Sequence, residues 1–145
     1  MLGTLIKKIW GTRQRILEND LSEIDYLVLD KDSACSIHNH DHKINRFILL
    51  TGKVYIKSDL GTYELKHNIP FDVHPPLYHQ FIVDEDSTMI EVAYVTEGKI
   101  DPDDINRVKQ GGKFIEEVID ADFGFTTKTF YTLDQLKLNE WEDDL

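Results

Sequence analysis

Three histidines at alternate positions, His38, His40 and His42, form the densest group of potential metal ligands in the chain. On a β-strand, residues two apart share a face, so imidazoles at this spacing can converge on a single ion. Two further histidines, His74 and His79, lie farther along the chain. Nitrogen ligands of which two are close in sequence and one is remote are a common way to build an open metal site. The alternative interpretation is a chance cluster at a solvated loop end.

The segments that must position these histidines are short, apolar and rich in Val, Ile, Tyr and Phe, as is typical of strands. Turn signals separate them, among them Gly52-Lys53 and Asp59-Leu60-Gly61, where hairpin turns need residues that tolerate positive φ. Many short strands without intervening helical patterns predict an all-β sandwich or barrel. The expected strands are Ile24–Leu29, Cys35–His40, Arg46–Leu50, Val54–Lys57, Thr62–Leu65, Gln80–Val83 and Met89–Val95.

The chain of 145 residues suits one domain, which at this size buries enough surface to fold without disulfides. Cys35 is the only cysteine, so the chain contains no pair that could form a disulfide. This composition fits a reducing compartment. The parity of the strand places Cys35 on the face opposite His38, which indicates core packing.

Sixteen basic and 27 acidic residues give a net charge of −11. Nucleic acids and anionic membranes attract basic surfaces, so neither is expected as a partner. No stretch approaches the roughly 20 apolar residues of a membrane helix, and the N-terminal apolar run is too short for a signal peptide. We therefore expect a cytoplasmic protein. The acidic residues near the end, Glu140 to Asp144, are expected to form a solvated tail.

Two helical segments are expected near the end of the chain. One begins at Asp101-Pro102, where an acidic cap precedes Pro in the first turn. The other covers Thr132–Leu145, because Thr132 and Gln135 match a capping box. Gly111-Gly112 is expected to interrupt the chain before this tail. The expected organisation is a barrel domain over residues 1–114 and an acidic C-terminal extension over residues 115–145, packed on the barrel or on a second subunit.

A homodimer is expected, since terminal segments outside the barrel carry apolar side chains that would favour association if exposed. The residues proposed to bury this surface are Leu5, Ile6 and Ile9 at the start of the chain, or Leu136 and Trp141 near its end. The competing interpretation is that both segments fold back on their own barrel.

The histidine cluster lies in a pattern that resembles the first cupin motif, HxH followed by three or four residues, Glu, six residues and Gly. Here His38-Asn39-His40 is followed by Asn45 and, after six residues, Gly52. The second cupin motif, Pro-x-Gly-x-x-His, is similar to the segment His74 to His79. The resemblance implies a small antiparallel cupin β-barrel, or double-stranded β-helix, with a short C-terminal helical extension.

A narrower resemblance connects most of the chain with the cupin domains of type II mannose-6-phosphate isomerases. Ile9-Trp10-Gly11 is similar to their "PWG" opening. Ile90-Glu91-Val92, Gly98 and Asp103-Asp104-Ile105-Asn106-Arg107 resemble their closing segment. The cluster HNHDHK resembles their HYHHHR.

These resemblances imply His38, His40 and His79 as ligands of one divalent metal ion, with Asn45 where the family has Glu. An amide oxygen is a neutral donor, which favours Zn²⁺, Fe²⁺ or Ni²⁺ over hard cations, while the family's own chemistry keeps Mn²⁺ among the candidates. His42 or His74 could replace the lost carboxylate ligand.

The function implied by the isomerase resemblance is aldose–ketose interconversion of a carbohydrate-like substrate, in which a general base moves a proton between adjacent carbons. The predicted catalytic residues are Glu91 and Tyr78, with Tyr55 and Lys57 as further candidates. Arg46, Lys43 and Arg107 are candidates for binding a phosphate. Two alternatives stay open: a three-histidine iron dioxygenase, and a non-catalytic binding or assembly module.

Overall fold

Two long strands, β6 (Ile44–Ser58) and β9 (His79–Tyr94), pair antiparallel over most of their length. Each strand joins two of the expected short runs. In β6 the register shifts between Leu49 and Val54, and Gly52 has a φ of 90°. A Cβ at Gly52 would lie 2.0 Å from the Ser87 Oγ. Gly52 therefore bends a continuous strand at a bulge, and the hairpin turn expected there is wrong.

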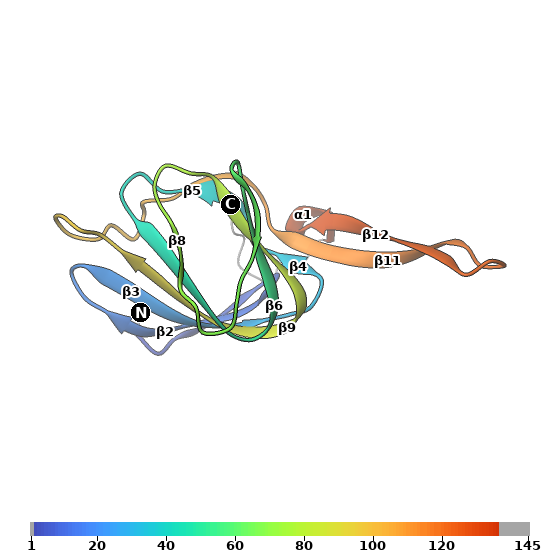
Figure 1. Ribbon diagram of the computed structural model, residues 1–145, viewed down its shortest axis with the longest axis horizontal. Coiled ribbons are helices and arrows are strands. Elements are labelled where there is room, and N and C mark those ends of the chain that lie inside the picture. The colour runs from blue at the N-terminus through green and yellow to red at the C-terminus, as the bar shows by residue number, and fades with distance from the viewer. Residues whose placement is uncertain (1, 137–145) are drawn as a thin grey trace.

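The computed structural model describes residues 2–136 as a curled antiparallel sheet that forms a barrel, from which one hairpin projects (Figure 1). The all-β cupin barrel predicted from the sequence is confirmed, including a short helix after the strands. The remaining strands of the described part are β1 (Leu5–Lys8), β2 (Gly11–Glu18), β3 (Ser22–Leu29), β4 (Ser33–Ala34), β5 (Ile37–Asn39), β7 (Gly61–Glu64), β8 (Phe71–Val73), β10 (Asn106–Lys109), β11 (Gly112–Asp120) and β12 (Phe125–Thr132).

The strands pair in an order that places distant parts of the sequence side by side. β1, β2, β3 and β9 are successive neighbours, and β9 also pairs with β6, which pairs with β7 and β8. The short strands β4 and β5 pair with β9 near its start, and β5 also pairs with β10. Residues from three separate parts of the chain, around β5, β9 and β10, therefore meet at one end of the barrel.

The apolar core fills the part of the barrel away from this end. Its centre is formed by side chains that are at most 1% exposed, among them Leu27, Phe47, Leu49 and Met89. Trp10 contacts Phe81 edge to face, with ring centroids 5.1 Å apart. Such aromatic pairs add to the stabilisation that burial of their large apolar surface provides.

The hairpin of β11 and β12 was not expected from the sequence. It pairs from Gly112 opposite Thr132 to Val118 opposite Thr126, its register shifts before Asp120, and it extends away from the barrel (Figure 1). We call this hairpin, residues 112–132, the arm. The predicted interruption at Gly111-Gly112 is wrong, because the chain passes directly into β11. These glycines permit close approach instead, since a Cβ at Gly111 would lie 2.5 Å from the Ala34 carbonyl oxygen.

The capping box predicted at Thr132 is present. The Thr132 N–H donates to the Gln135 side chain at 2.8 Å, and the Gln135 N–H donates to the Thr132 hydroxyl at 3.4 Å. The helix α1 covers Leu133–Leu136, and the rest of the predicted helix lies outside the described residues. The helix predicted at Asp101 is wrong: the Asp101 carboxylate accepts the Asp103 N–H at 2.9 Å and forms a turn that leads into β10.

The N-terminal segment packs on its own barrel through β1, which pairs with β2. Ile9 is 1% exposed within the core, whereas Leu5 is 64% exposed. Leu136 packs against the core, and Trp141 lies outside the described residues. No helix among residues 2–136 is long and apolar enough to span a membrane. The predicted homodimer and the domain boundary at residue 114, which falls inside β11, stay predictions.

Candidate metal centre

His38, His40 and His79 come together at the end of the barrel where β5 meets β9. Their nitrogen atoms all lie within 4.8 Å of one another. His38 and His79 are direct cross-strand partners, with ring centroids 4.6 Å apart. The three histidines are 2–9% exposed. The group thus combines His38 on β5, His40 directly after β5 and His79 at the start of β9.

Hydrogen bonds orient each imidazole in the same way. Nδ1 of each ring lies within hydrogen-bond distance of a backbone carbonyl oxygen, which can only accept, so each Nδ1 carries the proton. The distances are 3.0 Å from His38 to Ser36, 2.7 Å from His40 to Asp104 and 3.0 Å from His79 to Leu77. The Nε2 lone pairs are therefore the ones directed away from these carbonyls. Metal-binding histidines in proteins are commonly oriented by such a bond on the other nitrogen.

Burial keeps the three imidazoles neutral. It lowers the pKa of His38 well below the ordinary value, and the neighbouring His79 and His40 lower it further. Burial lowers the pKa of His79 to about 4 and also lowers the pKa of His40. Because a protonated imidazole cannot bind a metal ion, these neutral rings are the chemically competent form.

The Asp104 carboxylate fixes the loop that follows His40. It accepts the N–H groups of Asp41, His42 and Lys43 at 2.7, 2.9 and 3.0 Å. Burial alone would raise the pKa of Asp104, but these three donors lower it overall. The same residue binds His40 through its backbone oxygen. Asp104 therefore fixes both the conformation of the loop after His40 and the orientation of the His40 ring.

Two buried polar atoms of the described residues have no hydrogen-bond partner, and both lie at this site. They are His40 Nε2 and Asn45 Oδ1. Asn45 is 3% exposed, and its amide nitrogen lies 3.4 Å from His79 Nε2. A divalent cation would satisfy both orphaned lone pairs, so the residues present fit a metal ion. His42 and His74 are exposed and lie outside the group of three.

His38 and His40 line one end of a barrel cavity of about 350 Å³. Its wall carries charged residues on neighbouring strands, which is unusual for a barrel interior. Arg15 binds three carboxylates there, with distances of 2.6 Å to Asp25, 2.6 Å to Glu23 and 3.0 Å to Glu18. Lys43 lies 3.9 Å from Glu23. The cavity is consequently polar, walled by ion pairs, and of a size for a small molecule.

Glu91 projects into the same cavity from β9. It lies opposite Asp25 on β3 and opposite Phe47 on β6. Burial, and then the negative charge of Asp25, raise the pKa of Glu91 to about 7, against the opposing effect of Arg13, Lys43 and Arg15. A carboxyl group with this pKa can both accept and donate a proton near neutrality.

The other residues named from the sequence occupy different places. Tyr78 is half-buried just before β9 and is not among the described residues that line the cavity. Tyr55 and Lys57 alternate with the buried Val54 and Ile56, so they face outward. Arg46 also faces outward, where it forms a bidentate pair with Asp72 at 2.8 and 3.0 Å. Of the proposed phosphate ligands, only Lys43 and Arg107 line the cavity.

The sequence analysis missed the charged cavity wall formed by Arg13 and Arg15 on β2 and by Glu23 and Asp25 on β3. The signal was present, because charged residues occupy alternate positions on both strands. The interleaved residues of β3, such as Ile24 and Tyr26, are apolar, so alternation alone does not identify the charged face as the inward one. Asp104 was recognised only as part of a family segment.

Comparison with solved structures establishes the architecture. A structure of Pac13, described as a nucleoside dehydratase, aligns with a TM-score of 0.62 and 6% identity over 74% of this chain and 85% of that one. A Streptomyces PAC13 variant with uridine aligns with the same TM-score and 7% identity over 74% and 84% of the two chains. A double-stranded β-helix protein from Klebsiella pneumoniae aligns at 0.57 with 13% identity, over 70% and 81% of the two chains. The fold is a cupin fold.

KdgF from Halomonas aligns with a TM-score of 0.54 and 14% identity, over 59% of this chain and 81% of that one. No protein-family model and no curated protein sequence matches the chain. At these identities the likeness extends to the fold alone, so the chemistry has to be argued from the site.

Proposed function

We propose that this cupin is a metal-dependent enzyme that transfers a proton on a small carbohydrate-like substrate, in an aldose–ketose isomerase type of reaction. The observation that carries the proposal is that Glu91 lines the same cavity as His38 and His40, two members of the histidine group that His79 completes. A buried acid–base group and a set of neutral metal ligands facing one small cavity are the two components that such a reaction requires.

The metal ion would be held by the Nε2 atoms of His38, His40 and His79 and by the Asn45 amide oxygen. When bound, a divalent ion such as Zn²⁺, Fe²⁺, Ni²⁺ or Mn²⁺ polarises substrate oxygens and stabilises negative charge that develops on them. The protein's own contribution is orientation, because the carbonyl groups of Ser36, Leu77 and Asp104 fix the three rings.

Glu91 is proposed as the general base. With a pKa of about 7, it is partly ionised at neutral pH, so it can remove a proton from one substrate carbon and return it to the adjacent carbon. Asn45 faces Ala93, two residues from Glu91, which separates the two positions by about 7 Å along the strand. A sugar carbon chain fits between groups at this spacing. Tyr78 was also predicted as a catalytic residue. We assign the proton transfer to Glu91 alone.

The charges of the cavity support an anionic substrate such as a sugar phosphate. Arg13 and Arg107 line the cavity, and neither guanidinium forms an ion pair with any carboxylate of residues 2–136. Arginine binds phosphate and carboxylate groups through charge-assisted hydrogen bonds. The resemblance to type II mannose-6-phosphate isomerases supports the same substrate class.

A specific observation favours a second candidate, a three-histidine iron dioxygenase. The three histidines are neutral and Asn45 is an amide, so no ligand offsets the charge of the ion. Such a site resembles those of thiol dioxygenase cupins. Oxygen consumption by the iron-loaded protein would select this candidate over proton transfer.

The test uses the protein loaded separately with Zn²⁺, Fe²⁺, Ni²⁺ or Mn²⁺ and incubated with aldose 6-phosphates in D₂O. Proton transfer through an exchanging base is expected to introduce deuterium at C2, which NMR detects. Glu91→Gln is expected to lose this exchange while it retains its metal, and Glu64→Gln, at an exposed position on β7, is expected to keep both. Absence of exchange with every metal and sugar phosphate would reject the proposal.

A further inference from the structure

The tip of the arm carries apolar side chains in contact with solvent. Val118 and Ile119 are each 66% exposed, Phe123 is 76% exposed and Phe125 is 59% exposed. The two phenylalanine rings stack on each other, with centroids 6.1 Å apart. Apolar side chains gathered in this way mark interaction sites on soluble proteins. A two-stranded hairpin is also only marginally stable without packing against another surface.

A complementary surface lies at the root of the arm. There a groove of about 600 Å³ is bordered by Phe114 and Phe130, whose ring centroids are 4.8 Å apart, and by Ile37 and Ile82 of the barrel. We call this the root groove. It is large enough to receive an aromatic side chain, and its walls come from both the arm and the barrel.

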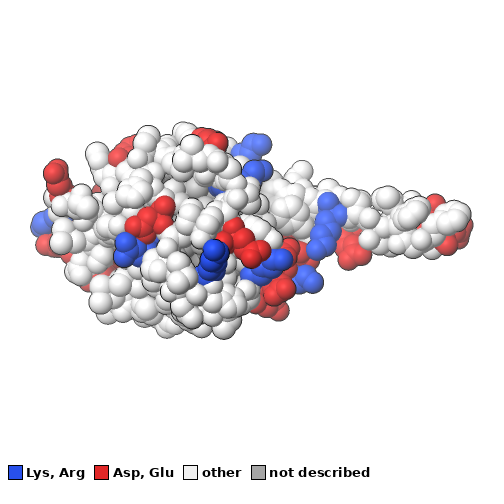
Figure 2. All heavy atoms as spheres, in the orientation of Figure 1, with Lys and Arg blue, Asp and Glu red and all other residues white. Residues whose placement is uncertain are grey.

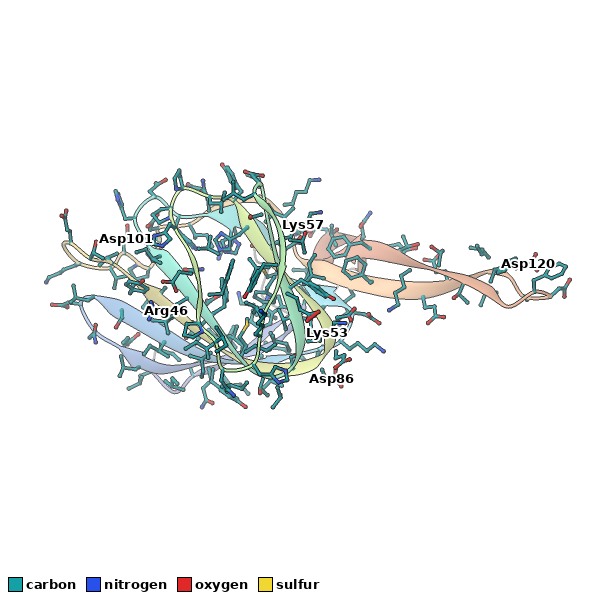
Figure 3. All side chains as sticks on the ribbon, viewed as in Figure 1. Arg46, Lys53, Lys57, Asp86, Asp101 and Asp120 are labelled. Atoms are coloured by element: carbon teal, nitrogen blue, oxygen red, sulfur yellow. The ribbon has the colours of Figure 1, made fainter. Side chains whose placement is uncertain are left out.

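The charges at the two ends of the arm are opposite. Lys57 and Lys109 line the root groove, together with one carboxylate, Asp134. The tip carries two carboxylates, Asp120 and Asp122, within its turn. Figure 2 shows acidic side chains at the end of the arm and both basic and acidic side chains beside its root, and Figure 3 labels Asp120 at the tip and Lys57 at the root. Tip and groove are thus matched in charge as well as in apolar character.

The tip and the groove cannot meet within one chain. They lie at opposite ends of an antiparallel hairpin whose strand β11 has nine residues, a length of ~30 Å. Two chains, however, can place their arms side by side in opposite directions. Each tip then reaches the other chain's groove, and a single two-fold axis relates the two contacts.

We propose that the arm is a dimerisation element whose tip, around Phe123 and Phe125, occupies the root groove of a second copy of this chain. The exchange is reciprocal, so both tips and both grooves are used and the assembly closes at two subunits. This interface is an alternative to the two terminal segments named from the sequence, around Ile9 and around Leu136; of these, Ile9 is buried in its own core. The groove is lined by Ile37 and Gln80, the neighbours in sequence of His38 and His79.

The first test measures mass by light scattering and sedimentation over a range of concentrations. The full chain is expected to be a dimer. Phe123→Ser and Phe125→Ser together are expected to raise the dissociation constant at least tenfold, because buried aromatic side chains dominate such interfaces. Leu60→Ser, at an 86%-exposed position in the β6–β7 turn, is the matched control and is expected to leave the dimer unchanged. Circular dichroism verifies that each variant is folded.

The second test locates the contact. Asp122→Cys combined with Lys109→Cys is expected to form a disulfide between two chains under mild oxidation, whereas either cysteine alone is expected to form it far less. Charge reversal gives an independent measure: Asp122→Lys is expected to weaken the dimer two- to fivefold, and adding Lys109→Asp is expected to restore it.

Three results would overturn the proposal. The first is a monomer mass for the full chain at high concentration. The second is a dimer that survives both phenylalanine substitutions and yields no disulfide between positions 109 and 122. The third is a dimer that is lost when residues 137–145 are deleted but kept in the tip variants, which would assign the contact to the C-terminal segment.

Discussion

Glu91 and Asp25 lie directly opposite each other in the β3–β9 register, and both line the barrel cavity. Asp25 is held in place by Arg15, whose Nε donates to its carboxylate at 2.6 Å. Burial and the charge of Asp25 together disfavour ionisation of Glu91. The wall that shapes the cavity therefore also sets the protonation state of the proposed base.

The raised pKa of Glu91 makes the stability of the protein depend on pH. The folded state, with a pKa of about 7, binds more protons than the unfolded chain, whose value is 4.5. The free energy of unfolding therefore falls as pH rises through this interval, by up to ~3 kcal/mol. Glu91→Gln is expected to remove the loss, so the variant should exceed the natural protein in stability at pH 8 and match it at pH 4.

Denaturant titrations at the two pH values measure this effect. Glu64→Gln is the control, since an exposed carboxyl group should leave the difference between pH 4 and pH 8 unchanged. If Glu91→Gln showed the same pH dependence of stability as the natural protein, Glu91 would not be the group with the raised pKa. The expected result would mean that the proposed base lowers the stability of the protein above neutral pH.

Replacing His79 by Ala is expected to remove most of the bound metal, because His79 supplies one of three convergent nitrogen atoms. His67→Ala is the matched control: His67 is exposed, and its Nε2 contacts the Gly52 carbonyl oxygen at 2.7 Å, outside the group of three. Elemental analysis of freshly purified proteins gives the metal content per chain. Equal losses in the two variants would show that the metal is adventitious.

Asp104→Ala is expected to weaken metal binding about 10- to 100-fold, although Asp104 is not a proposed ligand. The substitution removes the acceptor of three backbone N–H groups in the loop that follows His40. It should also lower the free energy of unfolding by roughly 2 kcal/mol or more. Asp103→Ala, one residue earlier and exposed, should change neither quantity. Calorimetric metal titrations with unchanged affinity for Asp104→Ala would reject the positioning role.

Asn45→Glu is expected to increase the affinity for Mn²⁺, because a carboxylate is a stronger donor to this ion than a neutral amide. Asn39→Asp provides the control: Asn39 lies between His38 and His40 but donates to the Pro76 carbonyl oxygen on the other side of the strand. Manganese titrations followed by electron paramagnetic resonance compare the variants. Unchanged affinity in Asn45→Glu would place residue 45 outside the ligand set.

Strand parity accounts for only part of the group of three histidines, because it concerns residues that are close in sequence, and His79 was named from the resemblance to the second cupin motif. His38 and His40 share a face by strand parity, and the structure brings His79 beside them. The expected strands correspond to β3, β5, β6, β7 and β9, but β6 and β9 were each divided in two, at Gly52 and near Asp86, where bulged strands resemble turns in sequence. The other strands, β1, β2, β4, β8 and β10 to β12, were not expected. A glycine with positive φ occurs both in β-bulges and in hairpin turns. Only the pairing with a neighbouring strand shows which of the two a given glycine forms.

The cavity wall and the arm could not be predicted in the same way. Alternation in β3 identifies two faces, yet the choice between Asp25 and Tyr26 as the inward residue depends on Arg15 across the strands. For the arm, Ile115 and Val118 fall among charged residues and threonines, a pattern without clear strand alternation, so the sequence predicted only an acidic extension packed on the barrel or on a second subunit. Its hairpin depends on register with β12 and on attachment to β4.

Trp10 lines the cavity that holds the histidines and is 4% exposed. Indole emission responds to the polarity of its surroundings and is quenched by paramagnetic ions nearby. The chain has two tryptophans, and replacing Trp141 by Phe would leave Trp10 as the sole emitter. The barrel thus contains its own optical reporter, through which the arrival of an ion or a small molecule can be followed without a label and before any substrate is known.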